Sequence, residues 1–221
     1  MGSKSRARPA TGGAGTAGKR RSGREVVAAL KDAASEEFSS RGYSRTKTAV
    51  IAQKAGVSEN LLFKHFGSKA NLFNDTVFNP IERHFAEFSA QHVVRVGNAE
   101  DRAEVSKKYI AEMQDFIREH ADAIMLLIMS RSFEDGEVNG IDKVAGLHRY
   151  FENTSEIVSK RVVGQPRIDP RLMACISFSA ILSCEIFADW LFPKGWGSKQ
   201  EIHEAVADFV LGGFRAGIDE G

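Results

Sequence analysis

Cysteine and proline are scarce in this sequence, and no long apolar run is free of charge. Among its 221 residues there are two cysteines and five prolines. Cys175 and Cys184 stand roughly 13 Å apart if their apolar stretch is one helix, so they cannot bridge within it. This excludes a disulfide scaffold, and a content of 43% hydrophobic and 27% charged residues excludes collagen-like and wholly disordered chains. We therefore expect a soluble folded protein.

The sequence also lacks a signal peptide and a convincing membrane span. Its basic start runs into glycine, alanine and threonine instead of an apolar segment. The best candidate span, residues 172–192, contains Glu185 and Asp189, and a central acid costs roughly 3 kcal/mol in hydrocarbon. We expect a cytoplasmic protein without membrane contact. Both acids are predicted to lie at an exposed rim; the alternative is that they meet a cationic effector.

The net charge of +1 is unevenly distributed. Residues 1–75 carry 14 basic and 6 acidic side chains, whereas residues 76–221 carry 16 basic and 23 acidic ones. The amino-terminal third is therefore suited to bind a polyanion. The alternative is that the asymmetry reflects only the composition of the tail.

Two phosphate-binding patterns in this tail are interpreted as coincidental. Residues 13–18 satisfy Gly-x-Gly-x-x-Gly, and residues 13–19 satisfy most of the phosphate-loop pattern. Both chemistries need a glycine turn between a buried strand and a helix, and the residues before the turn form no strand pattern. Arg20 also replaces the hydroxyl residue that would hold magnesium. We predict a flexible basic arm over residues 1–22 and no cofactor.

From Gly23 onward the apolar periodicity is helical. One amphipathic helix is predicted to end at Gly42, followed by two short helices joined by a tight turn at Gly56. This layout is typical of a helix-turn-helix DNA-binding unit, although any small helical hairpin uses glycine turns. The residues predicted to cap the second, third and fourth helices are Thr46, Ser58 and Ser68.

Residues 38–72 carry a motif with many fixed positions. The resemblance is to the amino-terminal domain of the tetracycline-repressor (TetR) family. In that family the third helix reads the major groove, and the starts of the second and fourth helices contact phosphates. The matching positions are Phe38-x-x-x-Gly42-Tyr43-x-x-Thr46-x-x-x-x-Ile51-Ala52-x-x-Ala55-Gly56-Val57-Ser58-x-x-x-Leu62-Phe63-x-x-Phe66-x-Ser68-Lys69-x-x-Leu72.

The resemblance implies a set of DNA contacts, with three departures from the family pattern. Phe63 replaces a tyrosine that usually donates to phosphate, and Leu61 replaces a commoner threonine, which favours contact with a thymine methyl group. Glu59 can accept from cytosine N4 but would repel phosphate. The implied contacts are Thr46, Lys47, Thr48 and Lys69 to the backbone, and Ser58, Glu59, Asn60, Leu61, Phe63, Lys64 and His65 in the recognition helix.

Each of these assignments has a structural alternative. Thr46 and Ser58 can be helix caps only, and Phe63 and Phe66 can be packing residues. His65 can be a solvated or core-edge side chain, and the lysines can be ordinary solvated residues. Three lysines that flank the recognition helix favour phosphate contact.

The remaining chain is also predicted to be helical, so the fold is all-α with about nine helices. Pro80 should kink the helix that begins at Leu72, because it lacks an amide donor. The predicted organisation is an arm (1–22), a helix-turn-helix domain (23–70) and an effector-binding and dimerisation domain (71–221). Helices are expected over residues 72–92, 99–119, 121–133, 141–163, 170–190 and 199–216.

Two apolar faces of this larger domain require partners, which core packing alone could also supply. The first is rich in Met and Phe, and the resemblance implies that it lines a pocket for a small, apolar effector. The second lies on the last two helices, which the family pairs with their copies in a four-helix dimer interface. The pocket set is Met113, Phe116, Ile117, Met125, Ile128, Met129, Phe133, Tyr150, Phe151 and Met173; the interface set is Ile176, Ser179, Ser183, Ile186, Trp190, Ile202, Val206, Phe209, Val210, Gly213 and Phe214.

No pattern in the sequence indicates an enzyme. There is no Glu-x-x-His pair, no His-Glu-x-x-His motif, no cluster of Cys and His at zinc spacing and no evident nucleophile with its base. We predict a homodimeric transcriptional repressor that binds palindromic double-stranded DNA and is released by an apolar effector. The alternative is a helical small-molecule-binding or adaptor protein without a DNA role.

Overall fold

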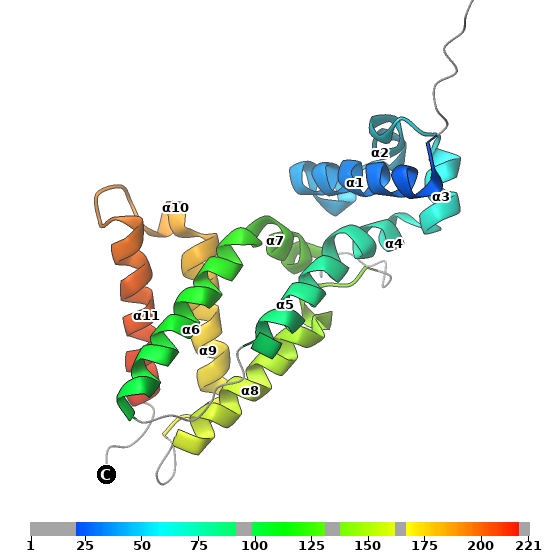
Figure 1. Ribbon diagram of the computed structural model, residues 1–221. Coiled ribbons are helices and arrows are strands. Elements are labelled where there is room, and N and C mark those ends of the chain that lie inside the picture. The colour runs from blue at the N-terminus through cyan, green and yellow to red at the C-terminus, as the bar shows by residue number, and fades with distance from the viewer. Residues whose placement is uncertain (1–20, 92–98, 131–137, 162–166, 217–221) are drawn as a thin grey trace, which may run out of the picture.

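The computed structural model describes residues 21–91, 99–130, 138–161 and 167–216. Within these ranges every regular element is a helix, which confirms the all-α prediction (Figure 1). None of the described helices is both long and apolar enough to cross a membrane. The predicted basic arm lies outside the described residues, except for its last two positions.

Three helices form the amino-terminal part: α1 (Gly23–Arg45), α2 (Thr48–Ala55) and α3 (Glu59–Phe66). Helix α1 begins with a capping box, in which Ser22 and Glu25 satisfy each other's amide groups. Ser22 therefore belongs to the folded domain and not to the arm. The predicted interruption at Gly42 is present, because its φ of 72° breaks the helical path shortly before Arg45.

The connection to the larger part is continuous: α4 (Lys69–Phe73), a π-helical turn η1 (Asn74–Phe78) and α5 (Asn79–Gln91). Pro80 has no amide to bond the Thr76 carbonyl, and its ring would clash with that oxygen in α-helical register. The preceding turn widens instead, so that the Asn79 amide bonds the carbonyl of Asn74, five residues earlier. The predicted disturbance by Pro80 is thus a π-turn.

The larger part consists of α6 (Ala99–Glu119), α7 (Ala121–Ser130), a 3-10 turn η2 (Ile141–Lys143), α8 (Ala145–Arg161), α9 (Pro170–Ile186), α10 (Ala188–Leu191) and α11 (Lys199–Ala216). Two predicted boundaries were wrong. The helix predicted from Ile141 starts as the η2 turn, and the helix predicted to reach Trp190 breaks at Phe187, whose φ and ψ are not helical. The segments around Phe133 and Gly136 lie outside the described residues.

The small amino-terminal part sits at one end of the molecule, and α11 lies at the other (Figure 1). One hydrophobic core joins them, since buried residues of α1, α5, α6, α7 and α9 belong to the same cluster. Helix α7 packs against α1, and α5 packs against α8. A shift of α7 would therefore be felt directly by α1.

Candidate functional site

The turn between α2 and α3 has the geometry of a helix-turn-helix unit. Gly56 adopts the left-handed conformation, with φ 69° and ψ 36°, which glycine reaches without a Cβ penalty. The Val57 amide closes the turn by donating to Ala52 at 3.0 Å. The Arg21 guanidinium donates to the Ala55 carbonyl at 2.9 Å, so it caps the end of α2. Sequence reasoning missed this role of Arg21.

Helix α3 presents most of its predicted contact residues on its exposed side. Asn60, Lys64 and His65 are exposed, and Phe63 is 41% exposed. Ser58 is exposed as well and caps the helix by accepting from the Leu61 amide. Leu62 is fully buried and anchors the helix to the core.

Leu61 and Phe66 differ from the exposed residues of α3. Both are partly buried and pack against the hydrophobic core. Phe66 is therefore a packing residue, which was the alternative to a DNA contact. Only the exposed part of the Leu61 side chain is available for the predicted contact with a thymine methyl group.

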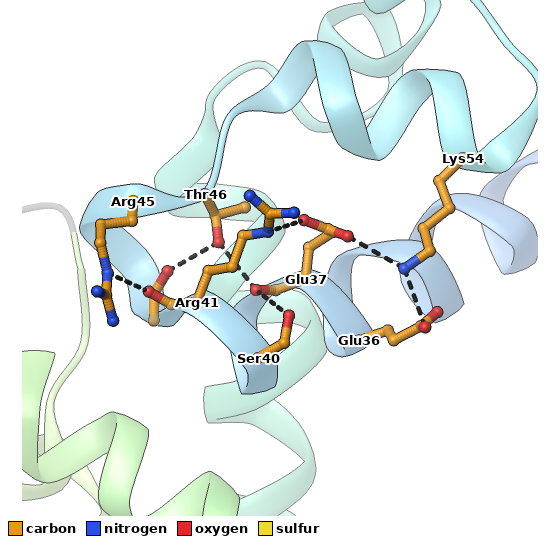
Figure 2. A network of polar contacts seen from close by, with 8 residues as sticks. Glu36, Glu37, Ser40, Arg41, Arg45, Thr46 and Lys54 are labelled. Atoms are coloured by element: carbon orange, nitrogen blue, oxygen red, sulfur yellow. Dashed lines mark hydrogen bonds and ion pairs between the residues drawn. The ribbon is translucent and has the colours of Figure 1, made fainter.

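The predicted phosphate contact of Thr46 was wrong. Its side chain is only 2% exposed, and its hydroxyl lies 2.7 Å from the Gly42 carbonyl and 3.0 Å from the Glu37 carbonyl (Figure 2). Thr46 therefore ends α1. The residue before α2 is Lys47, which makes no side-chain cap, so Thr46 does not cap α2 either.

A buried carboxylate holds α2 against α1 (Figure 2). Glu37 is buried on α1, and its Oε1 accepts from Lys54 Nζ of α2 at 3.0 Å, while Arg41 Nε lies 3.0 Å from Oε2. Lys54 also pairs with Glu36 at 2.9 Å. Hydrogen bonds to Glu36 and then Glu37 raise the pKa of Lys54 above its ordinary value. Sequence reasoning missed this network; the four-residue spacing of Glu37 and Arg41 was its only local signal.

Two of the predicted DNA contacts are bonded to each other. The hydroxyl of Thr48, the first residue of α2, donates to Glu59 Oε1 at 2.5 Å. Glu59 is the first residue of α3, and both side chains are partly buried. This bond joins the starts of the two helices that would meet DNA.

The start of α4 lies against the same part of the domain. Ser68 caps it by accepting from the Asn71 amide at 3.0 Å, as predicted. The Lys69 ammonium lies 4.3 Å above the Tyr43 ring centroid, in a cation–π contact with the end of α1. Lys69 is thus held in place beside the helix-turn-helix unit.

Comparisons with known proteins agree with this geometry. Residues 30–76 match the sequence model of the family described as bacterial regulatory proteins, tetR family. The helix-turn-helix part of this chain is therefore similar to the amino-terminal domain of that family.

The chain is similar to known proteins over a shorter stretch in sequence than in fold. An uncharacterized HTH-type transcriptional regulator of Mycobacterium tuberculosis is 35% identical over 67 residues, which are 30% of this chain and 34% of that protein. The chain thus matches about a third of that relative's length. That relative carries the name of a transcriptional regulator.

Solved structures share the fold along most of the chain. A TetR-like transcriptional regulator from Rhodococcus sp. RHA1 has a TM-score of 0.63 at 20% identity, covering 89% of this chain and 99% of that one. AibR, in complex with isovaleryl coenzyme A and operator DNA, has a TM-score of 0.60 at 17% identity, covering 83% and 97%. At these identities the likeness shows the fold alone.

The predicted pocket residues divide into three groups by their burial. Met113, Ile117, Tyr150 and Met173 are buried, whereas Phe116, Met125, Ile128 and Phe151 are partly buried. Met129 is 55% exposed, and its place in the pocket stays a prediction. Phe133 lies outside the described residues.

Aromatic rings gather between α5, α6, α8 and α9. Phe116, Tyr150 and Phe151 belong to this group, and burial raises the pKa of Tyr150 to about 12. The sequence prediction missed the other members, because their spacing within each helix does not reveal which helices pack together. They are Phe85, Phe88, Tyr109 and Phe178.

Glu185 does not lie at an exposed rim, so that prediction was wrong. Its side chain is only 10% exposed, and it accepts from Arg118 Nε at 3.0 Å and from Gln114 Nε2 at 3.1 Å. The Arg118 pairing supplies the positive charge that the alternative assigned to a cationic effector. Asp189 is exposed, as predicted.

The predicted interface residues occupy two sides of α9 and α11, except Trp190, which lies in α10. Val206 and Val210 are buried in the chain's own core, so their assignment to a dimer interface was wrong. Phe209 is 75% exposed and Trp190 70%, and Ile176 is also largely exposed. Of the others, Ser179 and Gly213 are exposed, while Ser183, Ile186, Ile202 and Phe214 are partly buried.

Proposed function

We propose that the protein is a homodimeric, sequence-specific transcriptional regulator, a repressor that a small apolar effector releases from palindromic DNA in the cytoplasm. The observation that carries this proposal is the exposed side of α3. It offers Asn60, Lys64 and His65 beside a turn held by Gly56, within the domain that matches the TetR family. AibR supports the proposal, since it was solved with both operator DNA and a small molecule.

On DNA, α3 would enter the major groove and the helix starts around it would meet phosphates. Amide and imidazole groups can read base edges, and Lys64 and Lys69 can neutralise phosphates. Lys47 precedes α2 and is exposed, which suits a backbone contact. Thr46 is not part of this proposed surface.

Dimerisation is proposed through the outer side of α9 and α11. Leu172, Ile176 and Phe209 form exposed apolar surface there, and water would be excluded from it in a dimer. Gly212 and Gly213 have no atoms within 4 Å of their Cβ positions, so a second helix can approach closely. A two-fold axis would place two copies of α3 on one face, about one DNA turn or a multiple of it apart.

Effector coupling is proposed to run through α5. This helix contributes Phe85 and Phe88 to the aromatic group and continues through η1 into α4, next to the recognition helix. An effector among these rings would favour a conformer with a different separation of the two α3 helices. It can do so only by binding the two conformers with different affinity.

A DNA titration tests this function. The full chain is titrated against DNA flanking its own gene, with random duplex as competitor, at two salt concentrations. We expect selective binding that persists at physiological salt. Binding that is equally weak on both DNAs and disappears with salt would contradict the proposal and favour a helical protein without a DNA role.

Two variants separate positioning from base reading. Lys69→Ala should weaken binding to all sequences and reduce the salt slope by roughly one unit, because one phosphate contact is lost. Asn60→Ala should instead relax the sequence preference. An equal loss on specific and random DNA would remove Asn60 from the base-reading set.

A further inference from the structure

Glu59 is an unusual residue for a surface that meets DNA. It is the only acid between Lys47 and Ser68, and it occupies the first position of α3. Residues at the start of a recognition helix approach base edges most closely. A freely moving carboxylate there would be repelled by nearby phosphates, so its position has to be controlled.

Thr48 supplies that control. Its hydroxyl donates to Glu59 Oε1 at 2.5 Å, a separation typical of a hydrogen bond to an ionised carboxylate. The β-branched side chain of Thr48 is stiff, and α2 fixes its backbone. The bond therefore orders the long Glu59 side chain before any DNA is bound, which reduces the rotamer entropy lost on binding.

The bonded carboxylate keeps one oxygen for a donor on DNA. Glu59 Oε2 can only accept a hydrogen bond, and the major groove offers amino groups from cytosine N4 and adenine N6. Adenine places its N7 acceptor beside N6, which would repel a carboxylate. Cytosine N4 is therefore the better partner.

We propose that Thr48 is a positioning residue that holds Glu59 so that its free oxygen accepts from cytosine N4 in each half-site. Thr48 then sets sequence preference, in place of the phosphate contact that the family resemblance implies for it. This inference rests on the proposed function, because it requires that α3 reads DNA.

The test is a selection of bound duplexes from a random pool by the full chain, followed by sequencing. Glu59→Gln removes the charge, Thr48→Val removes the donor but keeps the shape, and Thr48→Ser restores the hydroxyl. Asp32→Asn is the matched control, since it removes one carboxylate charge from an exposed site on α1.

Wild type and Asp32→Asn should enrich cytosine at one position of each half-site. Glu59→Gln should lose this preference by about 5-fold to 150-fold, the range of one base contact. Thr48→Val should lose at least about 5-fold, with no further loss when it is combined with Glu59→Gln, because both remove the same interaction. Thr48→Ser should recover the preference.

Several results would overturn the inference. An unchanged cytosine preference in Thr48→Val, or an equal loss of affinity for all sequences, would mean that the bond only joins the starts of α2 and α3 and does not set base preference. Enrichment of adenine at that position would refute the cytosine assignment. If wild type enriched no sequence at all, the proposed function itself would fail, which is a different outcome from a specific protein that ignores Thr48.

Discussion

Replacement of Thr46 by valine separates a structural role from a DNA-binding role. Valine keeps the shape and β-branching of threonine but cannot donate to the Gly42 carbonyl at 2.7 Å. The site is 2% exposed, so water cannot replace the lost donor without a rearrangement. A buried acceptor left without a partner costs roughly 1–3 kcal/mol.

We expect Thr46→Val to lower the free energy of unfolding by about 1–2 kcal/mol, towards the lower end of that range because the methyl packing is kept. For a chain of this size the melting temperature should fall by about 2–8 °C. Calorimetry gives the stability, and DNA titrations at several salt concentrations give the slope. Thr46→Ser, which keeps the hydroxyl, is the control.

The same variant should leave the salt slope and base preference of the folded protein unchanged. This is the opposite of the expectation for Thr48→Val, which should change preference. A stable Thr46→Val protein whose salt slope fell by one unit would refute the reasoning and restore Thr46 as a phosphate contact.

Three further perturbations follow from the packing. Phe209→Glu should produce a folded monomer in sedimentation equilibrium, since burial of this ring in both copies is worth roughly 3–6 kcal/mol; an unchanged dimer mass would place the interface elsewhere. Gly146→Ala should lower the free energy of unfolding in urea by about 1–3 kcal/mol, because the added Cβ would lie 2.7 Å from Phe85 Cβ and 2.8 Å from the Ala86 amide nitrogen. Gly23→Ala is the control, since its added Cβ meets nothing within 4 Å, and equal stabilities of the two variants would contradict the close approach of α8 to α5. Burial, and then the neighbouring His84, lower the pKa of His120 from 6.5, so the unfolded state binds the proton more readily and stability should decline as pH falls below about 6.5. His120→Gln should lack this part of the decline. Identical pH profiles of stability for wild type and His120→Gln would contradict the assignment of the decline to His120.

Local signals in the sequence predicted much of the helical framework. Ser58 and Ser68 cap helices as expected, because a cap depends on residues only three positions away. Pro170 stands in the first turn of α9 for the same local reason. The long motif between Phe38 and Leu72 then indicated the resemblance of this part to the TetR amino-terminal domain.

Interactions between distant segments were not predictable in the same way. The Glu185 carboxylate pairs with Arg118, 67 positions earlier, and no spacing rule indicates that bond. The spacing of Thr46 suggested a cap for the following helix, but its hydroxyl turns back to Gly42 in the preceding one.

Helix α11 shows a further limit of periodicity. Val206 and Val210 lie on one side of it and Phe209 on another, and all are apolar. The sequence alone predicted a single interface from both sides. Only the packing of α11 against α6 and α9 shows that the valines belong to the core and that the phenylalanine is exposed.

The most direct test of the account is a genome-wide selection with the purified full-length protein, in which bound genomic fragments are recovered at physiological salt and sequenced. We predict a small set of fragments that share an inverted repeat, with half-sites separated by about one DNA turn or a multiple of it. Asn60→Ala should recover a less defined set. Recovery of fragments in proportion to their abundance, with no shared repeat, would contradict the claim that this helix-turn-helix domain reads DNA sequence.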